Sequence, residues 1–322
     1  MTLREWLVSL LATLCSMAAH AQPSAYPNKP VRLIVAFAPG GPNDVMARML
    51  AAPLSQAAGV QFLVDNRPGA GGTIGTDAVA KAPPDGYTLL FTSAPFTMAP
   101  ALYAKLPYDT EKDFAAVTKV AVSPMVFMVG ASSPYKRLQD ILRAAKEHPG
   151  KLNYGSGGIA STPHVVTEAL ALLAGVKMTH VPFKGGGPAL VALQGGEIDV
   201  FFESITSSLG VIQQGRVRAL AVSTPKRALR LPDVPTMEEA GLANLSVTYW
   251  VGMLAPARTP QEVVGRLHAM VTEALTSSET RSRFAAIGAE TVGDAPAEFQ
   301  AFIRSELARW PRVVAEAQIQ PQ

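Results

Sequence analysis

The chain has 322 residues, of which 48% are hydrophobic and 16% are charged, so it can bury a large core and is too long for one compact domain. Lysine and arginine together number 28, against 25 for aspartate and glutamate, and the basic residues are scattered along the sequence. This distribution disfavours a nucleic-acid partner, which would require clustered basic residues. We therefore expect two domains with a mildly basic surface.

Residues 1–21 have the features of a secretory signal peptide. Arg4 precedes an apolar run at 6–14, and Ala19-His20-Ala21 forms a small-x-small cleavage site before Gln22. A membrane anchor is disfavoured because the apolar run is much shorter than the roughly 20 residues that cross a bilayer. Cys15, the one cysteine in the sequence, lies within this segment. We therefore predict export to a bacterial periplasm and a mature chain without disulfides or thiolate chemistry.

Alternating strand and helix patterns then follow through the mature chain and predict an α/β protein with largely parallel sheets. Runs rich in β-branched and aromatic residues predict strands at 31–37, 62–66, 88–92, 152–155, 178–181, 198–202 and 219–222. Helical patterns occupy 43–57, 73–81, 138–146, 163–173, 187–193, 207–214, 260–276 and 296–309. Pro311 is expected to break or kink the last helix.

Two long apolar stretches, 117–129 and 245–255, bracket a central block of about domain size. Chain segments of this kind can cross from one lobe to another. We therefore predict a discontinuous first domain, 22–124 plus 249–322, and a second domain at 125–248.

Four predicted strand ends carry turns rich in glycine or hydroxyl groups, at 37–44, 92–100, 155–164 and 203–210. Open α/β sheets bind ligands at the carboxyl ends of their strands, so these turns are candidates for a site that draws on both lobes. Glycine-rich turns are often purely structural, but four of them distributed over two lobes favour a ligand site.

The first and third turns suit an anion. Asn43 or Asp44 can cap the helix that follows Gly40 and Gly41, and Thr162 can cap the helix after 157–158. Both turns would then present free N–H groups and the positive end of a helix dipole. None of the four turns contains lysine or arginine, so we expect binding by amides and hydroxyls.

Other chemistries find no support in the motifs. The chain lacks a dinucleotide or Walker glycine motif, a nucleophile elbow around Ser156 and a zinc-protease H-E-x-x-H. A hydrolytic triad of Ser156, His164 and Asp199 is no better than chance. The five histidines are dispersed, at 20, 148, 164, 180 and 268, which does not indicate a metal site. We therefore expect neither an enzyme nor a bound cofactor or metal.

Ordered sequence blocks along nearly all of the mature chain resemble one known family. They include YPNKPVRLIVAFAPGGPND, VDNRPGAGGTIGTDAVAKAPPDGYTLL, HPGKLNYGSGG, HVPFKGGGPAL, GGEIDVFFES and RALAVSTPKRALRLPDVPTMEEAG. The chain is similar in these blocks to the Bug family, the periplasmic substrate-binding receptors of tripartite tricarboxylate transporters.

The resemblance implies a two-lobed periplasmic-binding-protein fold of type II, with a ligand cleft between two mixed-sheet domains. Such a receptor would capture a small organic carboxylate, partly through water, and deliver it to membrane permease subunits as a monomer. Known family ligands include di- and tricarboxylates, acidic amino acids and aromatic carboxylates. By position in the matching turns, the expected ligand-binding residues are Phe37, Pro39, Gly40, Gly41, Asn43, Asp44, Thr92, Ser93, Ser156, Gly157, Gly158, Ala160, Ser161, Thr162, Glu203 and Ser204. Thr206 is expected to face the cleft as well.

Glu203 departs from the family pattern. The family usually has Phe-Asp-Asn where this chain has Phe-Glu-Ser at 202–204. A longer carboxylate here could reach a protonated amine, shrink the cleft or point at the following helix, where an acid near the N-terminus is favourable by about 0.3 to 1 kcal/mol. As a hypothesis, Glu203 shifts the preference from citrate-like polyanions to a monocarboxylate or an amino-bearing acid.

Several further side chains remain open between a role in the site and a role in the fold. Asp44 is expected to orient its turn, because a carboxylate is a poor direct partner for an anion. Phe37, Phe96 and Tyr249 fit either pocket walls or core. Lys184 and Arg67 lie outside the four turns, so we expect mainly structural roles for them.

Two other functions remain open at this point. A receptor that signals ligand binding to a membrane kinase would use the same two-lobed clamp. An exported hydrolase or transferase would need an activated nucleophile or an acid–base pair, which the sequence does not offer.

Overall fold

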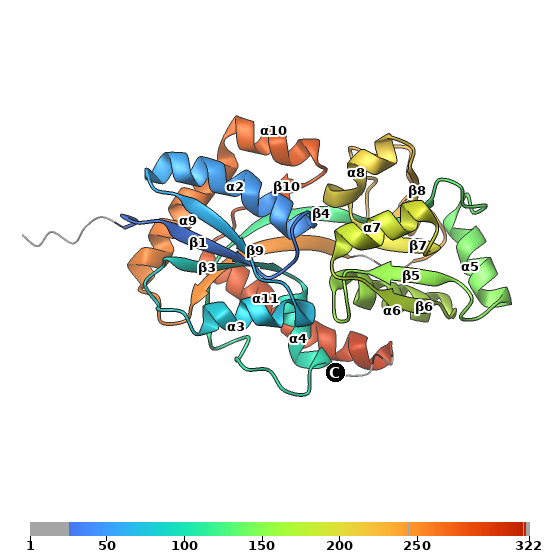
Figure 1. Cartoon of the computed structure of the whole chain (residues 1–322), viewed down its shortest axis with the longest axis horizontal. Coiled ribbons are helices and arrows are strands. Elements are labelled where there is room, and N and C mark those ends of the chain that lie inside the picture. Colours follow the sequence, from blue (N-terminus) through green and yellow to red (C-terminus); the bar gives the residue numbers. More distant parts are fainter. Residues whose placement is uncertain (1–25, 244, 246, 318, 320–322) are drawn as a thin grey trace, which may run out of the picture.

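The computed structural model describes residues 26–243, 245, 247–317 and 319, so the predicted signal peptide lies outside the described residues. In this part of the chain ten strands pair in the order β2-β1-β3-β9-β4-β7-β5-β6, with β8 and β10 also paired to β4 (Figure 1). The strands are β1 Val31–Val35, β2 Phe62–Asn66, β3 Thr88–Ser93, β4 Phe114–Gly130, β5 Asn153–Ser156, β6 Thr179–Pro182, β7 Val200–Ser204, β8 Val217–Val222, β9 Thr248–Pro256 and β10 Glu290–Thr291. The helices are α2 Pro42–Ala58, α3 Thr73–Ala80, α4 Pro95–Leu102, α5 Leu138–Glu147, α6 Thr162–Ala174, α7 Gly186–Gly195, α8 Ile205–Gln213, α9 Gln261–Thr276, α10 Ser278–Ala286 and α11 Pro296–Glu316, with a short 3₁₀ helix, η1, at Ala70–Gly72.

Strand β4 changes partners in its middle. It pairs with β9 as far as Pro124 and with β7 from Met125 onward. We call the part with β1, β2, β3, β9 and β10 sheet A, and the part with β5, β6, β7 and β8 sheet B. The change falls at the boundary predicted between the two domains, although the division into domains itself stays a prediction.

Both sheets are mixed, which makes the residue-based expectation of largely parallel sheets wrong and the mixed α/β fold correct. β1 is parallel to β2 and β3, and β5 is parallel to β6 and β7. β9 is antiparallel to both β3 and β4, and β4 is antiparallel to β7 and β8. Strand β4, which carries the chain from sheet A to sheet B, is antiparallel to its partners in both.

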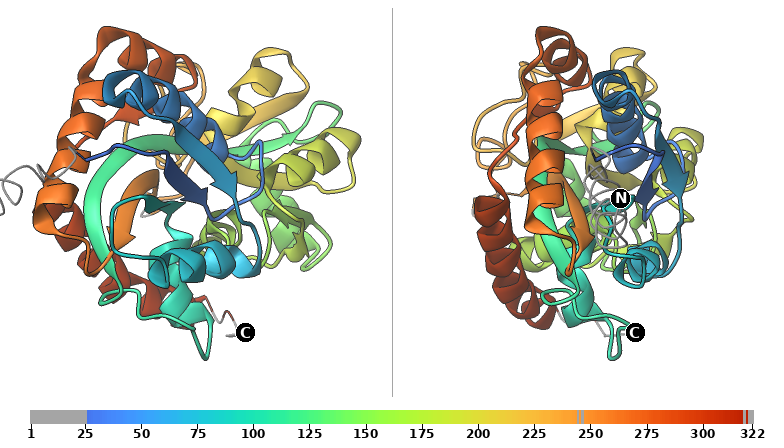
Figure 2. Two further views of the ribbon diagram at one scale, coloured as in Figure 1. Left: turned by 60° about the vertical axis from the view of Figure 1, so that its left-hand side comes forward. Right: turned by 90° about the vertical axis from the view of Figure 1, so that its left-hand side faces the viewer.

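The two sheets share one apolar core. A cluster of buried side chains extends from Val31 on β1 through Val117 and Phe127 on β4 to Val200 on β7. Figure 2 shows β4 as a long curved strand with α9 and α11 along its outer side. The curvature of β4 therefore sets how sheet A and sheet B face each other.

Helix α11 continues through Pro311 to Glu316, so the expected break is wrong. Proline inside a helix removes one backbone hydrogen bond and costs about 3 kcal/mol or more. On either side of it, Trp310 and Val314 are buried against the core of sheet A. Burial of two large apolar side chains contributes about 1.5 to 3 kcal/mol each, which offsets the cost of the proline.

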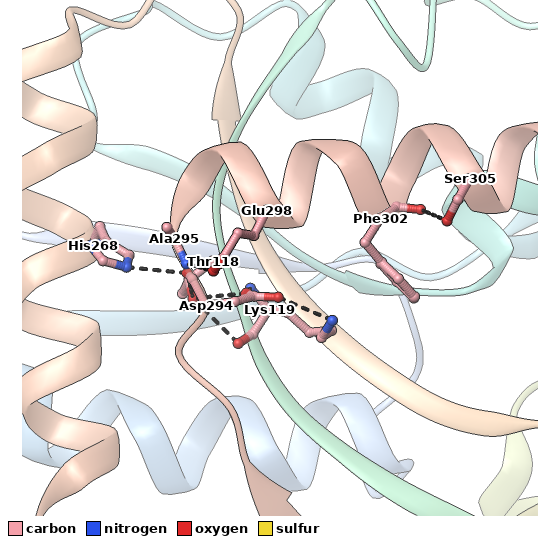
Figure 3. Close-up of polar contacts among 8 residues, drawn as sticks. All are labelled: Thr118, Lys119, His268, Asp294, Ala295, Glu298, Phe302 and Ser305. Atoms are coloured by element: carbon pink, nitrogen blue, oxygen red, sulfur yellow. Dashed lines mark hydrogen bonds and ion pairs between the residues drawn. The ribbon is translucent and has the colours of Figure 1, made fainter.

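Asp294 fastens the start of α11 to β4, on the face of sheet A shown in Figure 3. The register between β4 and β9 shifts on both sides of the pair 118–119. Asp294 Oδ1 accepts the N–H of Lys119 at 2.7 Å, and its Oδ2 pairs with Lys119 Nζ at 3.0 Å. Its carbonyl oxygen accepts from Thr118 Oγ1 at 2.8 Å and from His268 Nε2 at 3.1 Å. One residue thus satisfies the polar groups that the irregular strand leaves unpaired.

Candidate functional site

A cavity of about 700 Å³ lies where the carboxyl ends of strands from both sheets meet. Its walls come from the loops after β1, β2, β3, β5 and β6, from the end of β7 and from the start of β9. The lining residues are Ala36, Phe37, Ala38, Gly41, Pro42, Asn43, Pro68, Gly69, Ala70, Gly71, Gly72, Ser93, Pro95, Tyr103, Gly157, Gly158, Ile159, Ser161, Thr162, Pro163, Pro182, Phe183, Lys184, Gly185, Gly186, Glu203 and Tyr249. This is where open α/β sheets place their ligands.

The turn after β1 is ordered by Asp44. Helix α2 begins at Pro42 with Gly41 as its N-cap, one residue earlier than expected, so neither Asn43 nor Asp44 is the cap. The Asp44 carboxylate accepts the N–H of Gly40 at 3.0 Å and pairs with Arg48 at 2.9 Å. Burial raises the pKa of Asp44, but the hydrogen bonds from Arg48 and Gly40 outweigh it and hold that pKa below its usual value. Asp44 orients the turn from outside the cavity lining.

Asn43, Ser93 and Tyr249 form a buried hydrogen-bonded cluster at the cavity wall. Tyr249 donates its hydroxyl hydrogen to Asn43 Oδ1 at 2.9 Å and lies 3.3 Å from Ser93 Oγ, which accepts from Asn43 Nδ2 at 3.2 Å. Burial raises the pKa of Tyr249. Tyr249 is therefore a wall residue, whereas Phe96 packs edge-on against Phe114 in the core.

The turn after β5 presents the N-terminus of α6 to the cavity. Ser161 is the N-cap and Thr162 the first helical residue, one position earlier than expected. Ser161 donates its hydroxyl to the Gly158 carbonyl at 2.7 Å. Thr162 is only 2% exposed, and its Oγ1 has no hydrogen-bond partner among the described residues. An unpartnered buried hydroxyl at a helix N-terminus is suited to a ligand oxygen.

Ser156 supports this turn from behind rather than lining the cavity. Its hydroxyl shares a hydrogen bond of 2.6 Å with His180 Nε2 and accepts the N–H of Gly158 at 3.1 Å. His180 stacks on His164, with ring centroids 4.1 Å apart, and His164 Nδ1 accepts the N–H of Ala160 at 3.2 Å. Burial lowers the pKa of both histidines to about 4, so both rings are neutral at pH 7.

The residues of the rejected triad do not come together. Ser156 bonds to His180 rather than to His164, and the Asp199 carboxylate accepts the N–H of Asn153 at 2.7 Å. No carboxylate of the described residues orients the His180 ring. The pair therefore serves as a support for the turn.

Glu203 is the one carboxylate in the cavity lining. It is only 3% exposed, and its Oε1 accepts the N–H of Ser204 at 2.7 Å. Burial raises the pKa of Glu203 to about 7, and the Ser204 hydrogen bond only partly opposes this. The carboxyl group thus lies near the balance between its neutral and charged forms at neutral pH.

Seven of the expected residues lie outside the cavity lining: Pro39, Gly40, Asp44, Thr92, Ser156, Ala160 and Ser204. Pro39 and Gly40 are exposed at the surface, while Thr92 is buried within β3. Ser204, with Thr206, belongs to a hydroxyl network: Ser204 Oγ lies 2.8 Å from both Ser123 Oγ and Thr206 Oγ1. This network ties β7 to β4 where β4 changes partners.

Two lining loops were not among the expected ones, those at 68–72 and 182–186. The loop at 68–72 brings glycines that lie beside Tyr103, and the loop at 182–186 brings an exposed cation, Lys184, to the cavity. Arg67 stays outside the lining and pairs with Asp65 at 3.2 Å. Lys184, for which a mainly structural role is expected, is thus among the lining residues. Both loops are glycine-rich and follow strands, which is the pattern that predicted the other four turns. The same pattern could therefore have identified these two loops from the sequence.

Loops from the two sheets meet over the cavity. A Cβ added at Gly71, inside η1, would lie 3.3 Å from Ala160 Cβ, and one added at Gly185 would lie 3.1 Å from Ala38 Cβ. Both glycines have positive φ, of 62° and 119°. Glycine at these two positions allows the backbones to approach closely across the mouth.

The described part of the chain lacks two other kinds of feature. It contains no cluster of three or more histidine, cysteine or acidic residues that could hold a metal ion. None of its helices has the length and apolar character needed to cross a bilayer.

Comparisons with known proteins agree on one family. The family model for the tripartite tricarboxylate transporter family receptor, TctC, matches residues 46–319. The chain is 37% identical to a UPF0065 protein in a tcbD–tcbE intergenic region of Pseudomonas sp. strain P51, over 97% of this chain and 94% of that protein. It is 36% identical to BugT of Bordetella pertussis, over 96% of each chain.

Solved structures superpose closely on the chain. Rpa4515 of R. palustris with adipate has a TM-score of 0.89 at 35% identity, covering 92% of this chain and 100% of its own. MatC of Rhodopseudomonas palustris with bound malate has a TM-score of 0.86 at 34% identity, covering 90% and 100%. The periplasmic binding protein BugD has a TM-score of 0.88 at 34% identity, covering 92% and 100%. With this fold, this cavity and these matches along most of its length, the chain belongs to the tripartite tricarboxylate transporter receptor family.

Proposed function

We propose that this protein is a periplasmic receptor that captures a small organic carboxylate in the cavity between sheets A and B. It releases the acid, chemically unchanged, to the permease subunits of a tripartite tricarboxylate-type transporter. The predicted signal peptide supports the periplasmic location. The solved relatives with adipate and malate support a small carboxylate as the ligand.

One observation carries the proposal: the N-termini of three helices converge on the cavity. Gly41 and Pro42 bring α2, Pro95 brings α4, and Ser161 and Thr162 bring α6, whereas Glu203 Oε2 already lies against Gly186 at the start of α7. Each helix N-terminus offers free N–H groups and about half a positive charge. Three such ends around one cavity favour an anion strongly, and the ionised carboxylate is the common small organic anion that amides and hydroxyls bind well.

Capture rather than catalysis fits the side chains that line the cavity. Among the described lining residues there is no cysteine, serine–histidine pair or pair of carboxylates that could attack a bound acid or transfer its protons. Affinity is attainable from binding alone. An acid of about ten heavy atoms needs roughly −0.8 kcal/mol per atom for micromolar binding, below the limit of about −1.5.

We further propose that the sixteen residues expected from the sequence divide into two groups. Phe37, Gly41, Asn43, Ser93, Gly157, Gly158, Ser161, Thr162 and Glu203 line the cavity and are candidates for direct or water-mediated contact. The other seven position the turns. Pro124 and Thr248, where β4 and β9 pass between the sheets, are where two lobes would hinge.

Thr162→Val tests the proposal with little risk to the fold. The substitution keeps the shape of the side chain and removes a hydroxyl that has no partner among the described residues. We expect it to weaken the binding of adipate or malate about tenfold, as for one lost hydrogen bond of 1 to 1.5 kcal/mol, measured by calorimetry. Its melting temperature without ligand should stay close to that of the wild type.

Thr167→Val is the matched control in the same helix. Thr167 donates its hydroxyl to the Pro163 carbonyl at 2.6 Å and does not line the cavity, so its loss should lower stability and leave affinity unchanged. The proposal fails if no mono- or dicarboxylate raises the melting temperature of the wild-type protein, since a ligand at 100 times its dissociation constant should add about 2.7 kcal/mol.

A further inference from the structure

Glu203 faces the cavity with half of its hydrogen-bonding capacity unused. Oε1 accepts the N–H of Ser204, while Oε2 has no hydrogen-bond partner among the described residues. Oε2 lies beside Gly186, the first residue of α7, where an added Cβ would collide with it. Glycine at 186 therefore leaves space for the carboxyl group and for whatever approaches it from the cavity.

No cation of the described residues neutralises this carboxyl group. Glu203 forms no ion pair, and Lys184, the one cation in the lining, is exposed at the surface. Tyr249, a titratable neighbour in the cavity lining, gives its hydroxyl hydrogen to Asn43 instead. Buried carboxylates in proteins are normally paired, because an isolated buried charge is costly.

Two neighbouring parts of the cavity lining, the N-terminus of α6 and Glu203, thus differ in the charge that they favour in a ligand. The N-terminus of α6, where the Thr162 hydroxyl has no partner among the described residues, favours a negatively charged group of the ligand. Glu203 is 3% exposed, and its ionised carboxylate can only accept hydrogen bonds. It therefore favours a ligand group that donates a hydrogen bond, and a cationic donor such as an ammonium group most of all. A second carboxylate placed against Glu203 would instead bring two like charges together in a place of low dielectric.

We propose that Glu203 is a specificity-determining residue and that it selects an amino carboxylate, whose ammonium group pairs with Glu203 while its carboxylate binds at α6. The inference rests on the proposed function and narrows its ligand class. The apolar part of the lining, which includes Phe37, Ile159 and Phe183, would contact the uncharged part of the ligand. Ligand binding then completes an ion pair that the empty protein lacks.

Matched acids that differ by one group provide the test. We would measure, by calorimetry at pH 8, the binding of hexanoate, 6-aminohexanoate and adipate, of butyrate, 4-aminobutyrate and succinate, and of 3-phenylpropanoate and phenylalanine. We expect the amino member of at least one set to bind at least tenfold more tightly than its unsubstituted and dicarboxylate partners.

Glu203→Gln should reduce that preference to within about twofold. The amide keeps an acceptor for the Ser204 N–H and almost the same volume, so the fold should persist, which a circular dichroism spectrum and thermal unfolding would check. Glu168→Gln is the control: Glu168 accepts from the Tyr154 hydroxyl, does not line the cavity and should leave the preference unchanged.

Each other outcome has a definite meaning. If the dicarboxylates bind most tightly, or if Glu203→Gln keeps the preference for the amino acids, the inference is overturned and carboxylate capture stands. If carboxylates of every kind fail to bind the wild-type protein, the proposed function falls, and the inference falls with it.

Discussion

At the scale of single residues, the cavity shows how burial adjusts charge. Glu203 and His164 are buried and His180, stacked on His164, is half-buried, and burial favours the neutral form of each. For the acid this means a pKa raised to about 7, and for the two bases it means a pKa lowered to about 4. At neutral pH the histidine support of the α6 turn is thus uncharged, and Glu203 is the group whose charge responds to its surroundings.

The raised pKa of Glu203 predicts a stability that depends on pH. In the folded state the carboxyl group keeps its proton up to about pH 7, whereas the unfolded chain releases it near 4.5. The contribution of Glu203 to the free energy of unfolding is therefore fully present below pH 4.5 and is lost as the pH rises through 7. The difference in unfolding free energy between wild type and Glu203→Gln should fall by up to about 3 kcal/mol over this window.

Urea unfolding of the two ligand-free proteins at several pH values measures this difference. The other titratable lining residues are Tyr103, Tyr249 and Lys184, which both proteins retain, and burial raises the pKa of both tyrosines further above this range. A difference that stays constant from pH 4.5 to 7 would show that Glu203 is already ionised in the folded protein.

At the scale of elements, the irregular middle of β4 depends on the segment that leads into α11. Asp294 bonds to Thr118 and Lys119, the residues of β4 between its two register shifts. The Lys119 ammonium also lies over the Phe302 ring of α11, 4.1 Å from its centroid. The side chains of Lys119 and Asp294 are only 16% and 14% exposed, so this is a largely buried pair. Removing one partner of such a pair leaves the other charge unpaired in a place of low dielectric.

Asp294→Ala should therefore lower the unfolding free energy by about 3 kcal/mol. Asp85→Ala is the matched control, because Asp85 pairs with Lys29 at 3.4 Å with both side chains well exposed, and such pairs contribute at most about 1 kcal/mol. Denaturant unfolding measures both. Equal losses in the two variants would mean that Asp294 is not a special anchor. Neither residue lines the cavity, so carboxylate affinity should be preserved.

The elements also show where prediction from sequence succeeds. β2 was predicted with its observed bounds, because an apolar and β-branched run ends at Asn66 before Pro68. Helix α10 was missed because Thr280 and Phe284 are its only buried residues in the described structure, which leaves almost no apolar period to detect. Helix α11 was cut short because local sequence does not report the burial of Trp310 that holds it together.

For the site, the strand-to-helix turns were predictable but the individual side chains were not. Ser93 lines the cavity while its neighbour Thr92 does not, and Glu203 does while Ser204 does not. Successive side chains of a strand point to opposite faces, so an error of one residue in position reverses the assignment. Only the three-dimensional register decides which of two adjacent hydroxyls faces a ligand.

At the scale of the whole molecule, the cavity is bounded by two sheets, and among the described strands only β4 pairs with strands of both. Loops of the two sheets approach each other closely at Gly71 and Gly185. Binding by hinge closure would require a more open form without ligand.

We therefore expect ligand to make the protein more compact in solution. Small-angle scattering should give a smaller radius of gyration with the tightest-binding carboxylate than without it. Ala38→Trp places a large side chain opposite Gly185 and should hold the mouth open, so its scattering should respond much less. Scattering curves of the wild type that are identical with and without ligand would exclude a hinge of appreciable amplitude.

The position of β9 has a consequence for how the chain is made. In sheet A, β9 lies between β3 and β4, although it follows both of them, and all of sheet B, in the sequence. During synthesis or export, β3 and β4 therefore have no strand between them until residues 248–256 emerge. Sheet B needs nothing beyond Val222 and can assemble earlier. We expect the order of appearance of the chain to favour completion of sheet B first, with sheet A, and the cavity with it, formed only when the last quarter of the chain arrives.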